Sequence, residues 1–224
     1  MKQIIAGILF LLPTYGMAQT EWEKPETKPA QQEVAKVNKQ QKNTTKEENQ
    51  KYLEGAVPIV DGKVVFTLEL DVPGQQAGDI YQTVYQVLEN ITKESNQHPE
   101  SSIALVNKKE HIIAAKYKEW LVFQNSLLSL DRTVFHYTII AHCYDNRAKI
   151  TLSRISYAYE MNRSNNKGLE EVAENWIVDK YALNKKKTKL SKVTGKFRRK
   201  TIDRKDEIFQ LISNQLLKAT NNIQ

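Results

Sequence analysis

The sequence predicts an α+β protein, in which helices pack on one face of a curved antiparallel β-sheet. Two observations support this class. Residues 103–159 contain segments of alternating apolar and polar residues joined by short turns, which is typical of neighbouring antiparallel strands. Amphipathic patterns with helical spacing lie on either side of that region, so each supplies an apolar stripe to cover the sheet.

The first strand is expected at 63–70, where β-branched and aromatic residues follow the turn signal Asp61-Gly62. Val72-Pro73-Gly74 ends this strand, because proline cannot continue a hydrogen-bonded ladder. From Asp79 to Ile91, apolar residues recur every three or four positions, which predicts a helix.

Four strands are expected next, at 103–107, 111–123, 133–144 and 147–159. The third alternates most regularly, with odd-numbered residues from Phe135 to Cys143 on one side and even-numbered residues on the other. The connections are short enough to make a meander.

The C-terminal region, residues 161–224, is expected to be a helical extension. A helix is expected over 169–181, followed by a basic segment at 185–205. A last helix is expected from Asp203, as its N-cap, to Ala219.

The N-terminus predicts export. Lys2, the apolar run 4–12 and the small residues before Gln19 form a signal peptide, residues 1–18, cleaved after Ala18. The run is too short to span a membrane, and no further run approaches that length. Since the residue directly after the cleavage point is Gln19 and not a cysteine, the mature protein is expected to be periplasmic or secreted and not a lipoprotein.

Residues 19–55 are expected to form a flexible polar linker before an α+β domain at 56–160. The linker is rich in Gln, Lys, Glu, Asn and Thr, and contains few apolar side chains. Such a composition buries too little surface to offset the entropy lost on ordering.

Three motifs resemble a secreted bacterial family of unknown function. They are the stretches 57–66, Asp71-Val72-Pro73-Gly74 and 131–160, the last with Tyr-Asp-Asn-Arg at 144–147. The family has a fold like that of the TATA-box-binding protein (TBP-like), so the resemblance implies this topology for about half the chain. It implies no catalytic residues and, because fold does not determine function, no promoter binding.

The residues predict no catalytic, cofactor or metal site. His136 and His142 share a strand face but lie about 20 Å apart, too far to share one metal. Cys143, the sole cysteine, falls on the apolar side of its strand, opposite to its neighbour His142, and reads as a buried core residue. A small hydrolase with an unrecognised site stays open as the alternative to a binding protein.

The basic segment contains 11 lysine and arginine residues against one aspartate. It reads as a solvated connector between helices, or as a contact for an anionic envelope component. In the second interpretation Lys196, Arg198, Arg199 and Lys200 make the contact. Phe197 is its only aromatic residue, whereas single-strand nucleic-acid binders offer several stacking rings, so nucleic acid is not favoured.

The sheet face opposite the core is the second candidate binding surface. It is expected to present Trp120, His136, His142 and Tyr144, unless the C-terminal helices cover it or it is an ordinary solvated face. The sequence thus predicts an exported, non-catalytic interaction module that binds an envelope protein or an anionic envelope component.

Overall fold

The computed structural model describes residues 50–127, 129–161 and 168–221, which belong to one compact unit. The expected signal peptide and residues 19–49 of the expected linker lie outside the described residues. In the described part, no helix is both long and apolar enough to cross a membrane.

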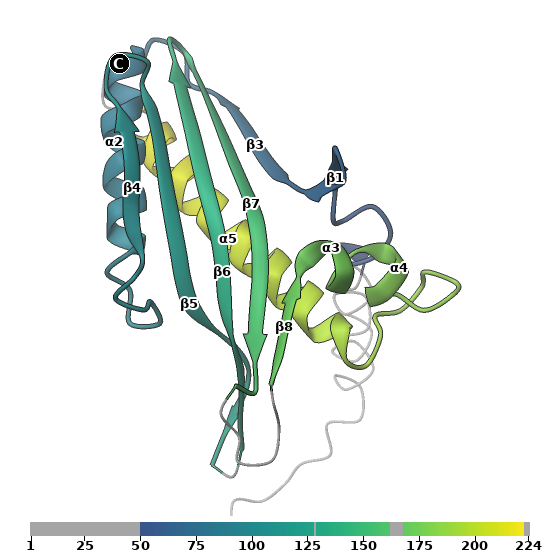
Figure 1. Ribbon diagram of the computed structural model, residues 1–224. Coiled ribbons are helices and arrows are strands. Elements are labelled where there is room, and N and C mark those ends of the chain that lie inside the picture. Colours follow the sequence, from purple (N-terminus) through teal and green to yellow (C-terminus); the bar gives the residue numbers. More distant parts are fainter. Residues whose placement is uncertain (1–49, 128, 162–167, 222–224) are drawn as a thin grey trace, which may run out of the picture. The chain divides into compact units, whose positions relative to one another are not determined.

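A six-stranded antiparallel sheet forms the centre of the described residues (Figure 1), which confirms the predicted α+β class. Five strands lie in the spatial order β3 (Phe66–Asp71), β7 (Arg147–Tyr159), β6 (Ser129–Tyr144), β5 (Ile112–Ser126) and β4 (Ser102–Asn107). The sixth, β8 (Leu169–Val172), pairs with the end of β7. A separate short hairpin consists of β1 (Ile59–Val60) and β2 (Lys63–Val64).

Both long helices, α2 (Ala77–Ile91) and α5 (Thr194–Asn221), lie against the same face of the sheet (Figure 1). The predicted alternation in β6 explains this arrangement. Its odd-numbered residues from Thr133 to Cys143 are buried beneath the helices, whereas its even-numbered residues from Val134 to His142 are half-buried. We call the face with the even-numbered β6 residues the open face, because neither α2 nor α5 covers it.

The prediction of a helix over 169–181 is wrong. Leu169–Val172 form strand β8, and the single-turn helices α3 (Ala173–Trp176) and α4 (Asp179–Ala182) follow it. β3 pairs with β7 only as far as Leu152, so the later part of β7 keeps a free hydrogen-bonding edge. β8 pairs with that edge, and this gain outweighs the local helical pattern.

The basic segment is not a connector over its whole length, because α5 already begins at Thr194. Asp203, predicted as the cap, lies in the third turn. The buried stripe of α5 begins with Phe197 and Thr201 and continues through Ile208, Ile212 and Leu216, at intervals of four or seven residues. Because basic residues are frequent in this segment, the start of the buried stripe is not recognisable in the sequence.

Order also begins before residue 56, where the sequence analysis placed the start of the domain. Tyr52 is buried, and its hydroxyl donates a hydrogen bond to Asp203 of α5 at 2.6 Å. The Tyr52 side chain therefore helps to attach the end of the expected linker to the C-terminal helix.

Candidate functional site

Strand register places a group of polar and aromatic side chains together on the open face. Trp120 and Lys118 of β5 lie opposite Val134 and His136 of β6, and His136 lies opposite Ser156 of β7. Since alternate residues of a strand point to one face, the indole, the ammonium group and the imidazole share a surface.

Trp120 has a charged and an aromatic neighbour. The guanidinium carbon of Arg132 lies 3.6 Å from the indole centroid, and the imidazole of His98 lies 4.8 Å from it. The Arg132 contact is a cation–π interaction, which orients the guanidinium over the indole. The indole is thereby fixed in a cationic environment.

The surroundings of His136 favour its neutral form. Partial burial lowers the pKa of its imidazole, and the nearby positive charge of Lys118 lowers it further. Lys118 forms an ion pair with Glu100, and the hydrogen bond from its ammonium lowers the pKa of that carboxyl. His136 can therefore donate one hydrogen bond and accept another from a ligand.

Three adjoining depressions lie along this half of the open face. One of about 490 Å³ is lined by His136 and Ser156 together with β8. It shares Ser156 with a depression of about 630 Å³ beside the β1–β2 hairpin. It shares Ala158 with a third of about 290 Å³, which includes Trp120.

A β-bulge shapes the largest depression. Between the pairs His136–Ser156 and Thr138–Ser153, β7 contains one residue more than β6. Arg154 sits in this bulge with φ of 54°, exposed to solvent. Bulges redirect side chains and are frequent near binding sites, and this one brings a guanidinium to the edge of the depression.

The open face does not bring the four predicted residues together. His142 and Tyr144 stack on each other, with ring centroids 6.4 Å apart, at the other end of β6. His142 lies eight residues along β6 from Val134, the residue that pairs with Trp120. This separation corresponds to about 27 Å along the strand. Trp120 and His136 therefore form the candidate site, and His142 and Tyr144 form a separate aromatic pair.

The four α5 residues that were predicted to contact an anion have different roles in the structure. For Arg198 the prediction is wrong. The Arg198 side chain is fully buried. It donates to the carbonyl oxygens of Tyr52 and Ile177 at 2.7 and 2.8 Å and pairs with Asp179 at 2.7 Å. An external anion cannot reach a guanidinium so enclosed.

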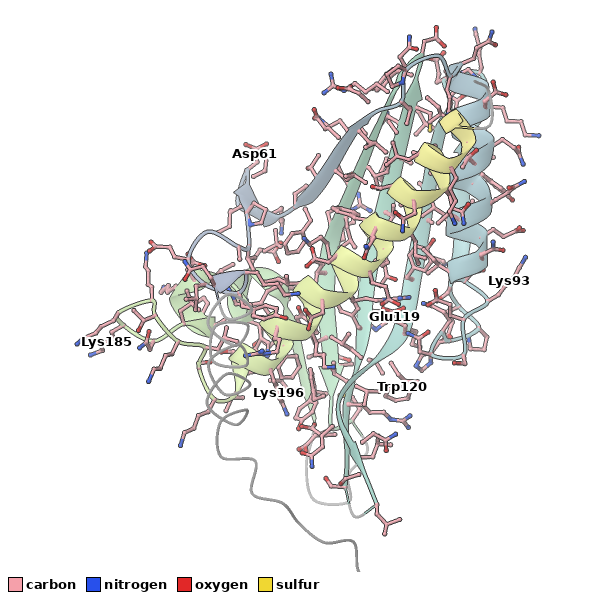
Figure 2. The ribbon with its side chains drawn as sticks, turned by 180° about the vertical axis from the view of Figure 1, so that it is seen from behind. Asp61, Lys93, Glu119, Trp120, Lys185 and Lys196 are labelled. Carbon is pink, nitrogen blue, oxygen red and sulfur yellow. The ribbon has the colours of Figure 1, made fainter. Side chains whose placement is uncertain are left out.

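The other three basic residues of that set are half-buried. The ammonium of Lys196, a residue labelled in Figure 2, binds Asp131 at 2.7 Å and the Tyr159 hydroxyl at 3.0 Å. The Arg199 guanidinium lies 4.6 Å from the centroid of the Tyr52 ring. Lys200 lines a small cavity next to Lys196.

Cys143 is buried in the core, as predicted, and burial raises the pKa of its thiol to about 12. Because the thiolate is the reactive form, we expect no labelling of the native protein by a thiol reagent at neutral pH. Denaturation is expected to make labelling complete, and absorbance of the released chromophore measures both. Rapid native labelling would contradict the burial.

Among the described residues, no group of three or more His, Cys, Asp and Glu side chains is arranged to hold a metal ion. The sequence analysis missed Ser156, Arg154 and the β8 residues that line the depressions. A lone serine and a lone arginine on a strand do not by themselves indicate a site, and the β8 residues were assigned to a helix.

Comparison with known proteins places this arrangement in a family. The family model described as a domain of unknown function (DUF4468) with TBP-like fold matches residues 66–158. A crystal structure of a DUF4468 family protein from Bacteroides ovatus ATCC 8483 is 39% identical, with a TM-score of 0.69 over 75% of this chain and 94% of that chain. The chain belongs to the DUF4468 family.

A second solved structure supports the topology alone. A TBP-like protein from Parabacteroides distasonis ATCC 8503 is 19% identical, with a TM-score of 0.56 over 71% of this chain and 96% of that chain. No curated protein matches the chain. The predicted family resemblance and TBP-like fold are thus confirmed, and the matched part of the DUF4468 domain contains β3 to β7, the strands that build most of the open face.

Proposed function

We propose that this DUF4468 protein is an exported, non-catalytic binding module of the cell envelope, and that its partner occupies the open face near Trp120 and His136. One observation supports this above all. Both long helices cover the same side of the sheet, which leaves indole, imidazole and ammonium groups half-buried on the other side.

The chemistry of the face favours an extended partner with acidic groups, either an envelope protein or an anionic envelope component. Lys116 and Arg154 are exposed and form no ion pair among the described residues. Between them lie Thr138 and Ser153, whose hydroxyls can both donate and accept hydrogen bonds.

The titratable groups favour binding over the alternative, a small hydrolase. A hydrolase needs a nucleophile or water held by a general base. In the part of the chain that the structure describes, His136 has no hydrogen-bonded side-chain partner. Buried groups with raised pKa values, such as Glu119 and Tyr137, lie on the helix-covered side of the sheet, away from the depressions.

The test introduces a bulky charge at the centre of the open face. Thr138→Glu is expected to weaken retention of a partner from an envelope extract at least tenfold, because a carboxylate there repels the acidic groups of the partner. Gln82→Glu, on the exposed side of α2, is the matched control and is expected to bind like the wild type.

Binding is measured by quantitative pull-down on immobilised protein, with circular dichroism to verify folding. Equal retention by the two variants would contradict an open-face site. If the protein hydrolysed a retained component and His136→Ala abolished that activity, the result would contradict the binding module and support the hydrolase.

A further inference from the structure

The β5–β6 hairpin extends beyond the rest of the sheet as a two-stranded ribbon (Figure 1). β7 pairs with β6 only from Thr133 onward, but β5 and β6 stay paired through Asn125–Leu130 to Ser126–Ser129. Four further residues at about 3.3 Å each extend the ribbon about 13 Å past its last strand pair with β7.

The end of this ribbon is uncharged and exposes leucine side chains. Leu127 has a relative exposure of 102%, and Leu130 is 45% exposed beside Met161 at 40%. Residues 121–130 contain no charged side chain. Tight hairpin turns favour glycine, asparagine and aspartate, so turn geometry does not account for a leucine here.

Lysines surround the base of the ribbon. Phe123, where the ribbon leaves the sheet, lines a cavity of about 260 Å³ together with Lys192, Lys196 and Lys200. Lys192 belongs to the loop 183–193 between α4 and α5, which we call the lysine loop. Its exposed cations, with Lys185 visible in Figure 2, are Lys185, Lys186, Lys187, Lys189 and Lys192.

We propose that the tip of the β5–β6 ribbon inserts into the interface of an anionic lipid bilayer, with the lysine loop resting on the headgroups. An uncharged tip enters the interface without desolvating charge, and apolar burial favours insertion. The lysines supply the second attraction that stable peripheral binding requires.

Charge favours a bilayer over a second copy of this chain. Tip-to-tip association would bring two lysine loops towards each other, and like charges repel at short distance. An anionic membrane instead neutralises these cations over its whole surface. This inference goes beyond the proposed function, since it concerns where the protein docks and leaves the open face unoccupied.

The test is co-sedimentation of the chain from Gln19, the expected mature form, with phosphatidylcholine vesicles with and without phosphatidylglycerol. We expect binding to the anionic vesicles that high salt suppresses. Leu127→Ser is expected to lower the partition coefficient about tenfold. Replacing Lys186, Lys189 and Lys192 with glutamine is expected to lower it about a hundredfold at low salt.

Matched controls sit elsewhere on the surface. Leu105→Ser removes a leucine that is 74% exposed on β4, and glutamine at Lys63, Lys108 and Lys109 removes three exposed lysines. Neither control is expected to change vesicle binding. The proposal is overturned if the wild type ignores anionic vesicles, if Leu127→Ser binds like the wild type, or if Leu127→Ser alters only self-association in size-exclusion chromatography.

Discussion

Replacing Arg198 with alanine is expected to lower the free energy of unfolding by about 3–5 kcal/mol. The fully buried guanidinium holds three segments together, because it donates to carbonyl oxygens of Tyr52, Leu53 and Ile177. It also pairs with Asp179 at 2.7 Å. Without it, a partly buried carboxylate and three carbonyl groups lose their partner.

Chemical denaturation monitored by circular dichroism measures the loss, with Lys200→Ala as control. Lys200 lies two residues away on α5, is half-buried and shows no ion pair among the described residues, so its removal is expected to change stability by less than about 0.5 kcal/mol. Similar stability of the two variants would contradict a structural role for Arg198.

The sheet was predictable because its strands alternate. In β6 the apolar side chains at odd positions from Phe135 to Cys143 sort to the buried side, and in β7 the predicted strand 147–159 matches the observed bounds. A period of two identifies a strand with one buried face regardless of what covers it.

The C-terminal region was less predictable, because tertiary contacts decide its structure. Leu169–Val172 fit a helical pattern, but the free edge of β7 converts them into a strand. In α5, Arg198 and Arg204 occupy buried positions that a hydrophobicity pattern reads as exposed. Partners distant in sequence, such as Asp179 and Glu119, make this burial possible.

The candidate site was predictable in part, because alternation along a strand assigns side chains to a face. Trp120 and His136 could be assigned to one face from strand alternation. Their association with Ser156 and Arg154 depends on the register between β6 and β7 and on a bulge, neither of which the sequence specifies. His142 shares the face but not the site, since alternation defines sides and not distances.

The second large effect is expected at Glu119, labelled in Figure 2, and Arg204, which form an ion pair between the sheet and α5. The Glu119 side chain is fully buried, and Arg204 donates to its two oxygens at 2.9 and 3.0 Å. Arg204→Met is expected to lower the free energy of unfolding at neutral pH by about 3–5 kcal/mol, because it leaves a buried carboxylate unpaired.

The loss is expected to depend on pH. Burial raises the pKa of Glu119, and Arg204 opposes that shift. Removing Arg204 therefore raises the pKa further. A carboxyl with a raised folded-state pKa favours the folded state below its unfolded-state pKa and loses that contribution as the pH rises through the folded-state value. Arg204→Met is thus expected to lose less stability as the pH falls towards 4.5, the ordinary pKa of the group, and least below it.

Adding Glu119→Gln to Arg204→Met separates charge from packing. The neutral amide has no charge to bury, so the double variant is expected to be more stable than Arg204→Met at neutral pH. Near pH 4.5 the two variants are expected to converge, because Glu119 is then protonated in the single variant. Urea unfolding at both pH values measures this difference. A loss in Arg204→Met that is the same at both pH values would show that packing, rather than the unpaired carboxylate, makes Arg204 necessary.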